Sequence, residues 1–542
     1  MFSRPRRSRL GLVGILTLSA ASLLLAQRGT APARPPLEDV ARRPVTLREN
    51  IGRAHEAVTT QVPRAQAFYD QGLAYLHSYV WLEAARSFNE ALRADANLAM
   101  AQLGLSYALG ELGLREPSRS AAAAAQRLGA NATDRERVRI DVRVRQVAAT
   151  AQPSDAALQA AYAKAKDQAL EKYPKDVELL LLIGQAQDPP LASHGLDHDS
   201  SSLPFYRRAL EQAPDYFAVH HYLAHAYENQ NRLDLALPHA ERFARDASAI
   251  PHAHHMYGHV LRRVSRIDEA IREFVKADEL ETSYFKRDGV PPEYDWHYRH
   301  NLNLLGMAYQ YVGQLKAAGE VLRRSFELES AVPPADDVNR KEWPALLLAQ
   351  GRPADALAAA RTLTGAATPL VRAVGYLLAS RALQAQKQLP AAAEQGNLAL
   401  QQMRAAGPVG GTLVPEFQLT QGEYLLRAGD AMKGRAMVLD AVQKLRAQAG
   451  PDAWAQTLFS LEAAARTARE IGDWELAAKL ADAMRGHDGG YAGTEYALAT
   501  IAEHNGDRTT AAGLFKNAVL RWANADPDLP ALSDAKRRAA AP

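Results

Sequence analysis

One pattern of small and large residues recurs along this chain with a period near 34 residues. In its first clear copy, Gly72 is followed by Tyr75, and Ala84, Phe88 and Ala91 come further on in that order. The small residue returns in later copies at Ala224, Gly258, Gly306, Ala379, Gly422, Ala465 and Ala499. A period of this length indicates a repeat protein, in which one unit cannot bury its apolar face alone and must stack against its neighbours.

The residue types in the pattern predict two antiparallel helices in each copy. Small residues let two helices approach closely, and the large residues fill the space against the next pair. Turn segments at 229–234, 263–268 and 504–509 fall between the two helices of their copies. Alanine dominates the apolar residues and aromatic residues make up only 7% of the chain, which favours packed helices over a β-sandwich. We therefore expect an all-α fold.

This skeleton resembles the tetratricopeptide repeat (TPR) over most of residues 60–525. The resemblance implies a right-handed α-solenoid of antiparallel helix hairpins, whose first helices line a concave groove. A Pro- and Asp-rich segment at 330–339 predicts a joint between two lobes. We expect an N-terminal array with a histidine-lined groove over residues 56–330, a C-terminal array over 331–525 and a disordered tail over 526–542.

The N-terminus has the pattern of an export signal. Four arginines precede an apolar run over residues 10–26, which ends in small residues that suit cleavage. We expect residues 1–26 to be a signal peptide and residues 27–55 to be a flexible Pro- and Arg-rich linker. The protein is then periplasmic or extracellular. The run also reaches the lower limit of a bilayer span, so an uncleaved anchor in the inner membrane is the alternative, and the only predicted membrane contact.

Charge and cysteine content exclude several classes of function. Removing the four arginines of residues 1–26 from the 64 basic residues leaves a net charge of −1 against the 61 acidic residues, so nothing indicates a nucleic-acid partner. The chain has no cysteine, which excludes disulfides, thiolate nucleophiles and cysteine-ligated zinc. The sequence also contains no glycine-rich phosphate loop after a strand, no Gly-x-Ser-x-Gly elbow and no complete zinc-protease motif.

Histidines are concentrated on the first helices of three consecutive copies. In a TPR hairpin the groove-facing positions lie six and three residues before the small residue, and one and four residues after it. These positions hold His221, His225 and Glu228 in one copy, His252, His255, His259 and Arg262 in the next, and His300 and Asn303 in the third, with His297 one turn earlier. By the same spacing, His220 and His254 fall on the packing side of their helices.

Two interpretations of this stripe remain open. In the first, its residues bind an extended segment or a helix of a protein partner, because imidazoles hydrogen-bond and stack on peptides without a metal. In the second, the i, i+4 pairs His221 with His225 and His255 with His259 share a divalent transition metal such as zinc. Glu228 would then hold a histidine by hydrogen bonding or act as a general base.

The histidine-bearing segments "HHYLAHAYE", "PHAHHMYGHV" and "HYRHNLNLLG" are similar in their order to those of exported bacterial TPR proteins and of the eukaryotic tetratricopeptide repeat protein 38 group. That resemblance implies that histidine helices are a feature of the group, but it supplies no activity. Three functions stay open: an exported scaffold that binds a protein or peptide in its groove, a metal-binding protein or metal-dependent enzyme, and a structural subunit of a cell-envelope assembly. The scaffold is the leading interpretation, because the sequence offers no complete catalytic set.

Overall fold

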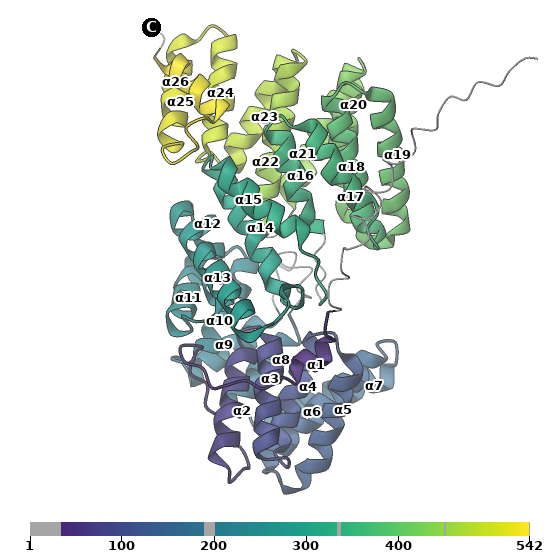
Figure 1. Ribbon diagram of the computed structural model, residues 1–542, viewed down its shortest axis with the longest axis vertical. Helices are drawn as coiled ribbons and strands as arrows, with labels where there is room; N and C mark the ends of the chain where they lie inside the picture. The colour runs from purple at the N-terminus through teal and green to yellow at the C-terminus, as the bar shows by residue number, and fades with distance from the viewer. Residues whose placement is uncertain (1–33, 189–200, 333–337, 449–450, 541–542) are drawn as a thin grey trace, which may run out of the picture.

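The computed structural model describes residues 34–188, 201–332, 338–448 and 451–540, and the expected export signal at 1–26 lies outside them. The described residues form α-helices and short 3-10 helices, with no strand among them. None of these helices is long and apolar enough to cross a membrane. Figure 1 shows the helices stacked in chain order from one end of the molecule to the other.

Within the described residues the chain forms twelve antiparallel hairpins of consecutive helices. The first seven are α2 (Pro63–Leu76) with α3 (Trp81–Ala94), α4 (Ala99–Glu111) with α5 (Arg115–Leu128), α6 (Asp134–Ala151) with α7 (Ala156–Lys172), α8 (Val177–Gln185) with α9 (Leu203–Gln212), α10 (Phe217–Asn229) with α11 (Leu233–Asp246), α12 (Pro251–Arg263) with α13 (Ile267–Asp288), and α14 (Trp296–Tyr311) with α15 (Leu315–Glu327). The other five are α16 (Glu342–Ala349) with α17 (Pro353–Thr364), α18 (Pro369–Ala385) with α19 (Leu389–Ala405), α20 (Val414–Arg427) with α21 (Ala431–Ala447), α22 (Pro451–Glu470) with α23 (Trp474–His487), and α24 (Ala492–His504) with α25 (Arg508–Arg521). The prediction of an all-α solenoid of TPR-type hairpins is confirmed.

The turns inside the hairpins use one residue with left-handed backbone. Asn231 has a φ of 57° between α10 and α11, and Ser265 has a φ of 64° between α12 and α13. The next amide then donates back over the turn, as from Arg232 N to the Tyr227 carbonyl at 2.8 Å. Tyr79 occupies the equivalent place between α2 and α3 with a φ of 59°. A bulky residue in this conformation is strained and must be held by its surroundings.

Small residues allow the close helix contacts that the repeat pattern predicts. A Cβ atom built on Gly258 of α12 would lie 2.8 Å from Cε1 of Phe274, and one built on Gly104 of α4 would lie 2.3 Å from Cζ of Phe88. Both phenylalanines are fully buried. The glycines therefore provide the space that each large residue of the second helix fills.

Residues 34–55 pack against the first hairpins, so the prediction of a flexible linker is wrong for this part of the chain. A short helix, α1 (Leu37–Ala41), buries Val40 in the main core. Arg86 of α3 donates to the backbone carbonyls of Arg43 and Pro44. The Pro and Arg content of the segment cannot show that a distant buried arginine will bind its carbonyl groups.

The end of the chain is also more ordered than the sequence predicts. The helix α26 (Pro530–Ala539) lies within the segment 526–542, for which we expect a disordered tail. It places Leu532 in a core with Phe515 of α25, and the hydroxyl of Tyr496 donates to Asp534 at 2.7 Å. The prediction fails because the apolar stripe of α26 is too short to be distinguished from a polar tail by its periodicity.

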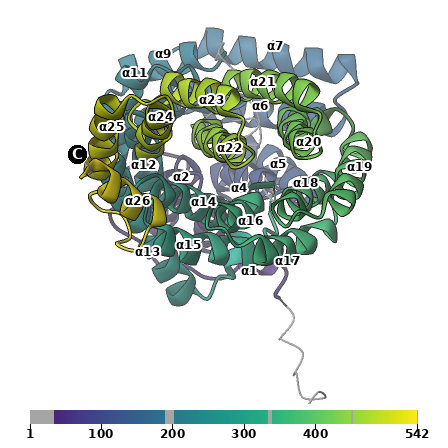
Figure 2. The same cartoon turned by 90° about the horizontal axis from the view of Figure 1, so that it is seen from above.

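One hydrophobic cluster joins the two arrays. The predicted boundary near residue 330 follows α15, but a hydrophobic cluster runs across it from Leu305 of α14 to Leu458 of α22. The ring of Tyr311 lies 5.7 Å from that of Trp454 and 5.0 Å from that of Tyr491. Figure 2 shows the helices of the C-terminal array curving around α22. Helices of the C-terminal array therefore pack against the last helices of the N-terminal array.

Candidate metal centre

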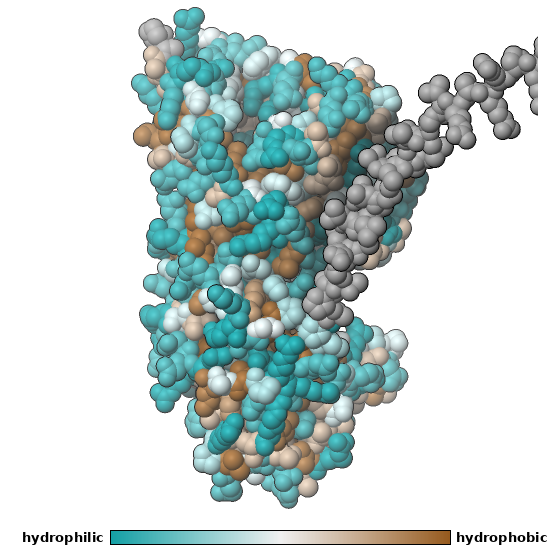
Figure 3. Space-filling view, in the orientation of Figure 1, coloured by the Kyte–Doolittle hydropathy of each residue, from teal (hydrophilic) through white to brown (hydrophobic). Residues whose placement is uncertain are grey.

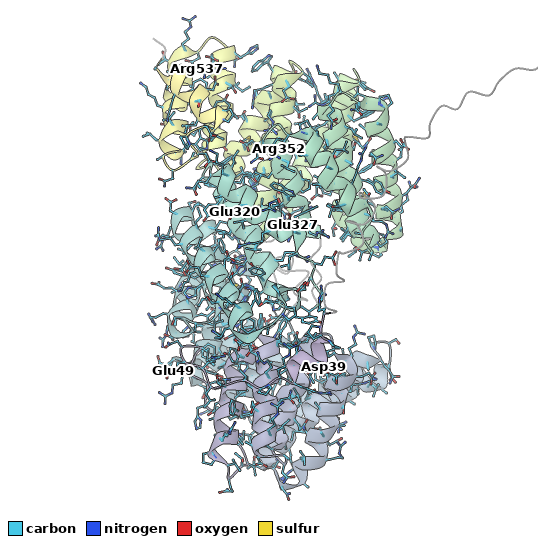
Figure 4. The ribbon with its side chains drawn as sticks, viewed as in Figure 1. Asp39, Glu49, Glu320, Glu327, Arg352 and Arg537 are labelled. Atoms are coloured by element: carbon cyan, nitrogen blue, oxygen red, sulfur yellow. The ribbon has the colours of Figure 1, made fainter. Side chains whose placement is uncertain are left out.

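Polar side chains collect inside the N-terminal array, in contrast to their usual place on the surface. The face seen in Figure 3 is largely hydrophilic, and the charged residues labelled in Figure 4 are all exposed on the outside of the solenoid. Seven histidines instead lie buried or half-buried between α10, α12 and α14. They are His221, His225, His252, His255, His259, His297 and His300. Buried imidazoles need partners for both ring nitrogens, so their contacts define what this cluster can do.

The first cluster, trio 1, consists of His221 and His225 of α10 and His252 of α12. The Nε2 atom of His252 lies 3.1 Å from Nε2 of His221 and 3.1 Å from Nε2 of His225. A tetrahedral zinc ion with Zn–N bonds of about 2.1 Å separates its ligand nitrogens by about 3.4 Å. Trio 1 therefore has the geometry of a three-imidazole metal site.

The proton position on His221 follows from a backbone contact. Its Nδ1 atom lies 2.6 Å from the carbonyl oxygen of His77, and a carbonyl only accepts, so Nδ1–H donates. The Nε2 atom of His221 then carries the lone pair that faces the other members of trio 1. His77 is itself held by the Tyr222 hydroxyl at 3.0 Å and by Glu178 at 2.6 Å. Outer hydrogen bonds of this kind orient metal-binding histidines.

The second cluster, trio 2, consists of His255 and His259 of α12 and His300 of α14. The Nε2 atoms of His259 and His300 lie 3.4 Å apart. The Nδ1 atom of His259 lies 3.0 Å from a carboxylate oxygen of Glu228, which accepts its proton and leaves Nε2 with a lone pair. Trio 2 thus repeats the arrangement of trio 1, with a carboxylate in place of the carbonyl.

His255 is oriented by a side-chain amide. The Nδ2 group of Asn301 donates to the Phe274 carbonyl at 3.0 Å, which turns its Oδ1 atom toward His255. That oxygen lies 3.1 Å from Nδ1 of His255 and accepts its proton. The lone pair of His255 is consequently on Nε2, the nitrogen that the other oriented histidines also present.

Burial keeps His221, His252 and His255 neutral. The loss of water around His221 lowers its pKa to about 3, even though its bond to the His77 carbonyl opposes the change. Burial also lowers the pKa of His252 and of His255 well below the usual value, and neighbouring histidines lower both further. The neutral ring is the form that binds a metal ion. The interior of the array therefore disfavours protons on the nitrogens that could bind a metal.

Glu228 holds a histidine in this structure. Burial alone would raise its pKa, but His259 and the adjacent Arg263 and Arg262 keep that pKa below the usual value. The carboxylate is therefore ionised, and Arg263 also donates to the Glu228 backbone carbonyl at 3.0 Å. Of the two roles that the sequence leaves open, the contact with Nδ1 of His259 corresponds to the orienting one.

The two i, i+4 pairs predicted to share one ion lie in different trios. They are His221 with His225, and His255 with His259. Each pair gains a third imidazole from the first helix of the next hairpin, because His252 joins trio 1 and His300 joins trio 2. The helix α12 sits between α10 and α14, so one turn of it faces each neighbour. The four histidines that the sequence assigns to one ion therefore fall into two separate groups of three histidines, and metal binding by them stays a prediction.

The remaining groove residues of the sequence prediction are buried as well. Arg262 is 1% exposed and its guanidinium lies 5.7 Å from the centre of the Trp454 ring. Asn303 accepts from the Ser325 hydroxyl at 2.7 Å. On the packing side, His220 contacts His239 of α11 at 2.7 Å, as the spacing predicts. Peptide binding along this stripe stays a prediction that requires its interior contacts to open.

Tyr79 is part of the site, although the sequence does not indicate it. Its ring centre lies 4.5 Å from that of His221, 5.6 Å from that of His225 and 5.4 Å from that of His252. These contacts account for the strained backbone at Tyr79, because its left-handed turn aims the ring at trio 1. A tyrosine at a turn position that usually holds glycine or asparagine is the signal that could have identified it.

Without metal, the protein is expected to lose stability as the pH falls below about 6.5, the ordinary pKa of histidine. His221, His252 and His255 have a lowered pKa when folded, so the unfolded chain binds more protons in this range. The free energy of unfolding then falls with falling pH, by about 1.4 kcal/mol per pH unit for each histidine. For His221 the loss continues to about pH 3. Thermal unfolding of chelator-treated protein at several pH values measures this, and a flat profile would contradict the burial of neutral rings.

The chain matches no protein-family model and no curated protein. Among solved structures it is similar to YrrB, described as a TPR protein with an unusual peptide-binding site, at 20% identity over 36% of this chain and 91% of that one, with a TM-score of 0.27. It is similar to the APC/C hetero-tetramer Cut9-Hcn1 at 11% identity over 88% and 90%, with a TM-score of 0.30. It is also similar to the human IFIT1 dimer with m7Gppp-AAAA at 13% identity over 86% and 91%, with a TM-score of 0.33. Likenesses at this level carry no argument about function, and the fold rests on the hairpins of the chain itself.

Proposed function

We propose that this chain is an exported TPR solenoid protein that binds divalent transition-metal ions through trio 1 and trio 2. The observation that carries the proposal is that the Nε2 atoms of His221 and His225 both lie 3.1 Å from the Nε2 atom of His252. The outer nitrogen of His221 is already bound to a carbonyl oxygen, so the inner one is left as an electron-pair donor. This is the arrangement that metal-binding histidines adopt.

Core packing of these histidines without a metal ion accounts for the geometry of trio 1 less well than metal binding does. The Nε2 atom of His252 lies at hydrogen-bond distance from the Nε2 atoms of both His221 and His225, but a neutral His252 has at most one proton there and can donate to only one of them, while its Nδ1 atom has no hydrogen-bond partner. A buried polar atom left without a partner costs about 1–3 kcal/mol. A bound cation would accept a lone pair from each of the three Nε2 atoms, which gives the residues a reason to be together.

The ligand set selects the class of metal. Trio 1 and trio 2 consist of imidazoles alone, which suit zinc, copper or nickel. Magnesium and calcium prefer oxygen ligands and are not expected here. Zinc is the first choice, because three histidines and one further ligand complete its tetrahedral geometry.

Elemental mass spectrometry of the purified mature protein tests the proposal. We expect up to two transition-metal ions per chain, and a lower melting temperature after chelation that added zinc restores. The variant His239→Ala is the control, since His239 contacts His220 outside both trios and its loss leaves the metal content unchanged. Metal-free protein whose stability responds to neither chelator nor zinc would remove the basis for a metal function.

A second candidate function is binding of a protein partner in the C-terminal array. A cavity of about 390 Å³ lies there, with walls that include Arg381, Gln384 and Glu423. The Oε1 atoms of Gln384 and of Glu423 are buried without a hydrogen-bond partner, which favours a ligand that donates to them. A photo-crosslinking residue at Ala385 in the cavity wall should capture one defined partner in cells, while the same residue at exposed Glu320 should not. Equal labelling from both positions would contradict this function.

Export rests on the basic and apolar pattern of residues 1–26 and on the likeness of the histidine helices to those of exported bacterial TPR proteins. The mass of the mature chain after cell fractionation tests it. A periplasmic or secreted chain shortened near residue 26 is expected. A full-length chain in the membrane fraction indicates the anchor, and a full-length cytoplasmic chain would contradict export.

A further inference from the structure

His297 lies between the two trios and belongs to neither of them. It stands in the first turn of α14, where Asp295 caps the helix by accepting from the His297 amide at 2.9 Å. Its ring centre is 4.7 Å from that of His252 in trio 1 and 4.2 Å from that of His255 in trio 2. The ring is 4% exposed, so water does not surround it. One imidazole thus contacts both proposed metal sites.

The two nitrogens of His297 are in different situations. Its Nδ1 atom lies 2.6 Å from a carboxyl oxygen of Glu281, which is fully buried near the end of α13. Its Nε2 atom is buried and has no hydrogen-bond partner. The outer nitrogens of His221 and His259 are held by oxygen atoms in the same way, and both present Nε2 to a trio. The unpartnered atom of His297 is therefore the one that a ligand role requires.

We propose that His297, positioned by Glu281, is a seventh imidazole ligand that completes the four-coordination of one ion in a two-ion centre formed by trio 1 and trio 2. This inference rests on the proposed metal function. Two four-coordinate ions have eight ligand positions, and seven imidazoles fill all but one of them. One ion therefore keeps a position for an exchangeable water or small anion. An open position of this kind is typical of reactive metal sites, whereas purely structural sites are closed.

A cavity beside the centre gives that open position a route to small molecules. It has a volume of about 180 Å³, and its lining includes Tyr79, His252, Glu281, Trp296 and His297. The cavity thus touches trio 1 through His252 and the proposed seventh ligand through His297. An anion of two or three atoms fits such a space easily.

A different assignment is possible for the same residues and is separable by experiment. Glu281, Asp295 and His297 also offer ligand atoms within 4.8 Å of one another. An ion held by these three would compete with the Asp295 cap of α14, because the same carboxylate accepts from the amides of His297 and Tyr298. The unpartnered Nε2 atom of His297 favours the seven-imidazole centre, because that atom points away from the Nδ1 contact with Glu281.

Cobalt(II) titration tests the inference, since the visible absorption of cobalt reports its ligands. We expect wild-type protein to bind two cobalt ions, one of which changes its spectrum on adding azide. In His297→Ala, one ion should bind at least about 10-fold more weakly and both ions should respond to azide. Added imidazole should restore the wild-type spectrum in His297→Gly, which a merely structural role would not allow. Glu281→Gln should weaken the same ion, and His239→Ala should change nothing.

The outcomes separate this inference from the proposed function. Wild-type protein that binds no cobalt overturns both. Wild-type protein that binds two ions, with His297→Ala unchanged in affinities and spectrum, overturns only the seventh ligand. An ion lost to the same degree in Asp295→Asn and in His297→Ala also overturns it and assigns that ion to the carboxylate group. Circular dichroism of each variant identifies any that fail to fold, and for these the imidazole rescue of His297→Gly decides.

Discussion

Replacing His252 with alanine is expected to empty trio 1 and to remove one metal ion per chain. His252 is the central member of that trio, because its Nε2 atom lies 3.1 Å from those of both His221 and His225. Without it, trio 1 is reduced to an i, i+4 pair on one helix. Loss of an orienting partner alone costs about 10–100-fold in metal affinity, so loss of a direct ligand should cost at least that much. Elemental analysis after dialysis against a weak chelator measures the change.

The matched control for this variant is His239→Ala. His239 is also a partly buried histidine of the same array, but its contact is with His220 on the packing side. Its loss should leave the metal content at the wild-type value. If His252→Ala keeps the full complement of metal after dialysis, trio 1 is not a metal site.

Replacing Arg139 with methionine is expected to lower the free energy of unfolding by about 3–5 kcal/mol, the cost of breaking a buried ion pair on one side. Arg139 of α6 is 4% exposed and donates to Glu56 at 2.7 Å and to Asp176 at 2.9 Å. Its removal leaves the buried Asp176 without its cation and leaves Glu56 with only the exposed Arg135, which donates to it at 2.9 Å. Asp176 caps α8, whose Glu178 holds His77 behind trio 1, so the effect should extend to the metal centre.

Urea unfolding of this variant and of Arg145→Met measures the difference. Arg145 lies on the same helix and donates to Asp141 at 2.9 Å, but both side chains are exposed. An exposed pair contributes only about 0–1 kcal/mol, so this control should unfold almost as the wild type does. Neutralising the partners with Glu56→Gln and Asp176→Asn should recover part of the stability lost in Arg139→Met. Equal effects of the two arginine variants would contradict the burial of this network.

The fold could be predicted from the sequence because the repeat is local. Each copy carries its own small residue, large residue and turn, as at Gly258, Phe274 and Ser265, and these specify a hairpin without reference to distant parts of the chain. The two ends could not be predicted in the same way. Residues 34–55 and α26 are ordered by contacts with other hairpins, such as the bond from Arg86 to the Pro44 carbonyl.

The candidate site could be predicted only in part, for a related reason. Helical spacing indicates which histidines share a face, and it brings together His221 with His225 and His255 with His259. It does not indicate how far one hairpin is rotated against the next, and that rotation decides whether His252 faces α10 or α14. The supports of trio 1 come from still further away, since the His77 carbonyl lies 144 residues from His221 in sequence.

Diffraction from crystals grown with zinc tests the central claim most directly, because anomalous scattering at the zinc edge locates each ion independently of any structural expectation. We predict two strong peaks inside the N-terminal array, one about 2.1 Å from the Nε2 atoms of His221, His225 and His252 and the other at the same distance from those of His255, His259 and His300. Zinc found only at surface carboxylates, with both trios empty, would contradict the account.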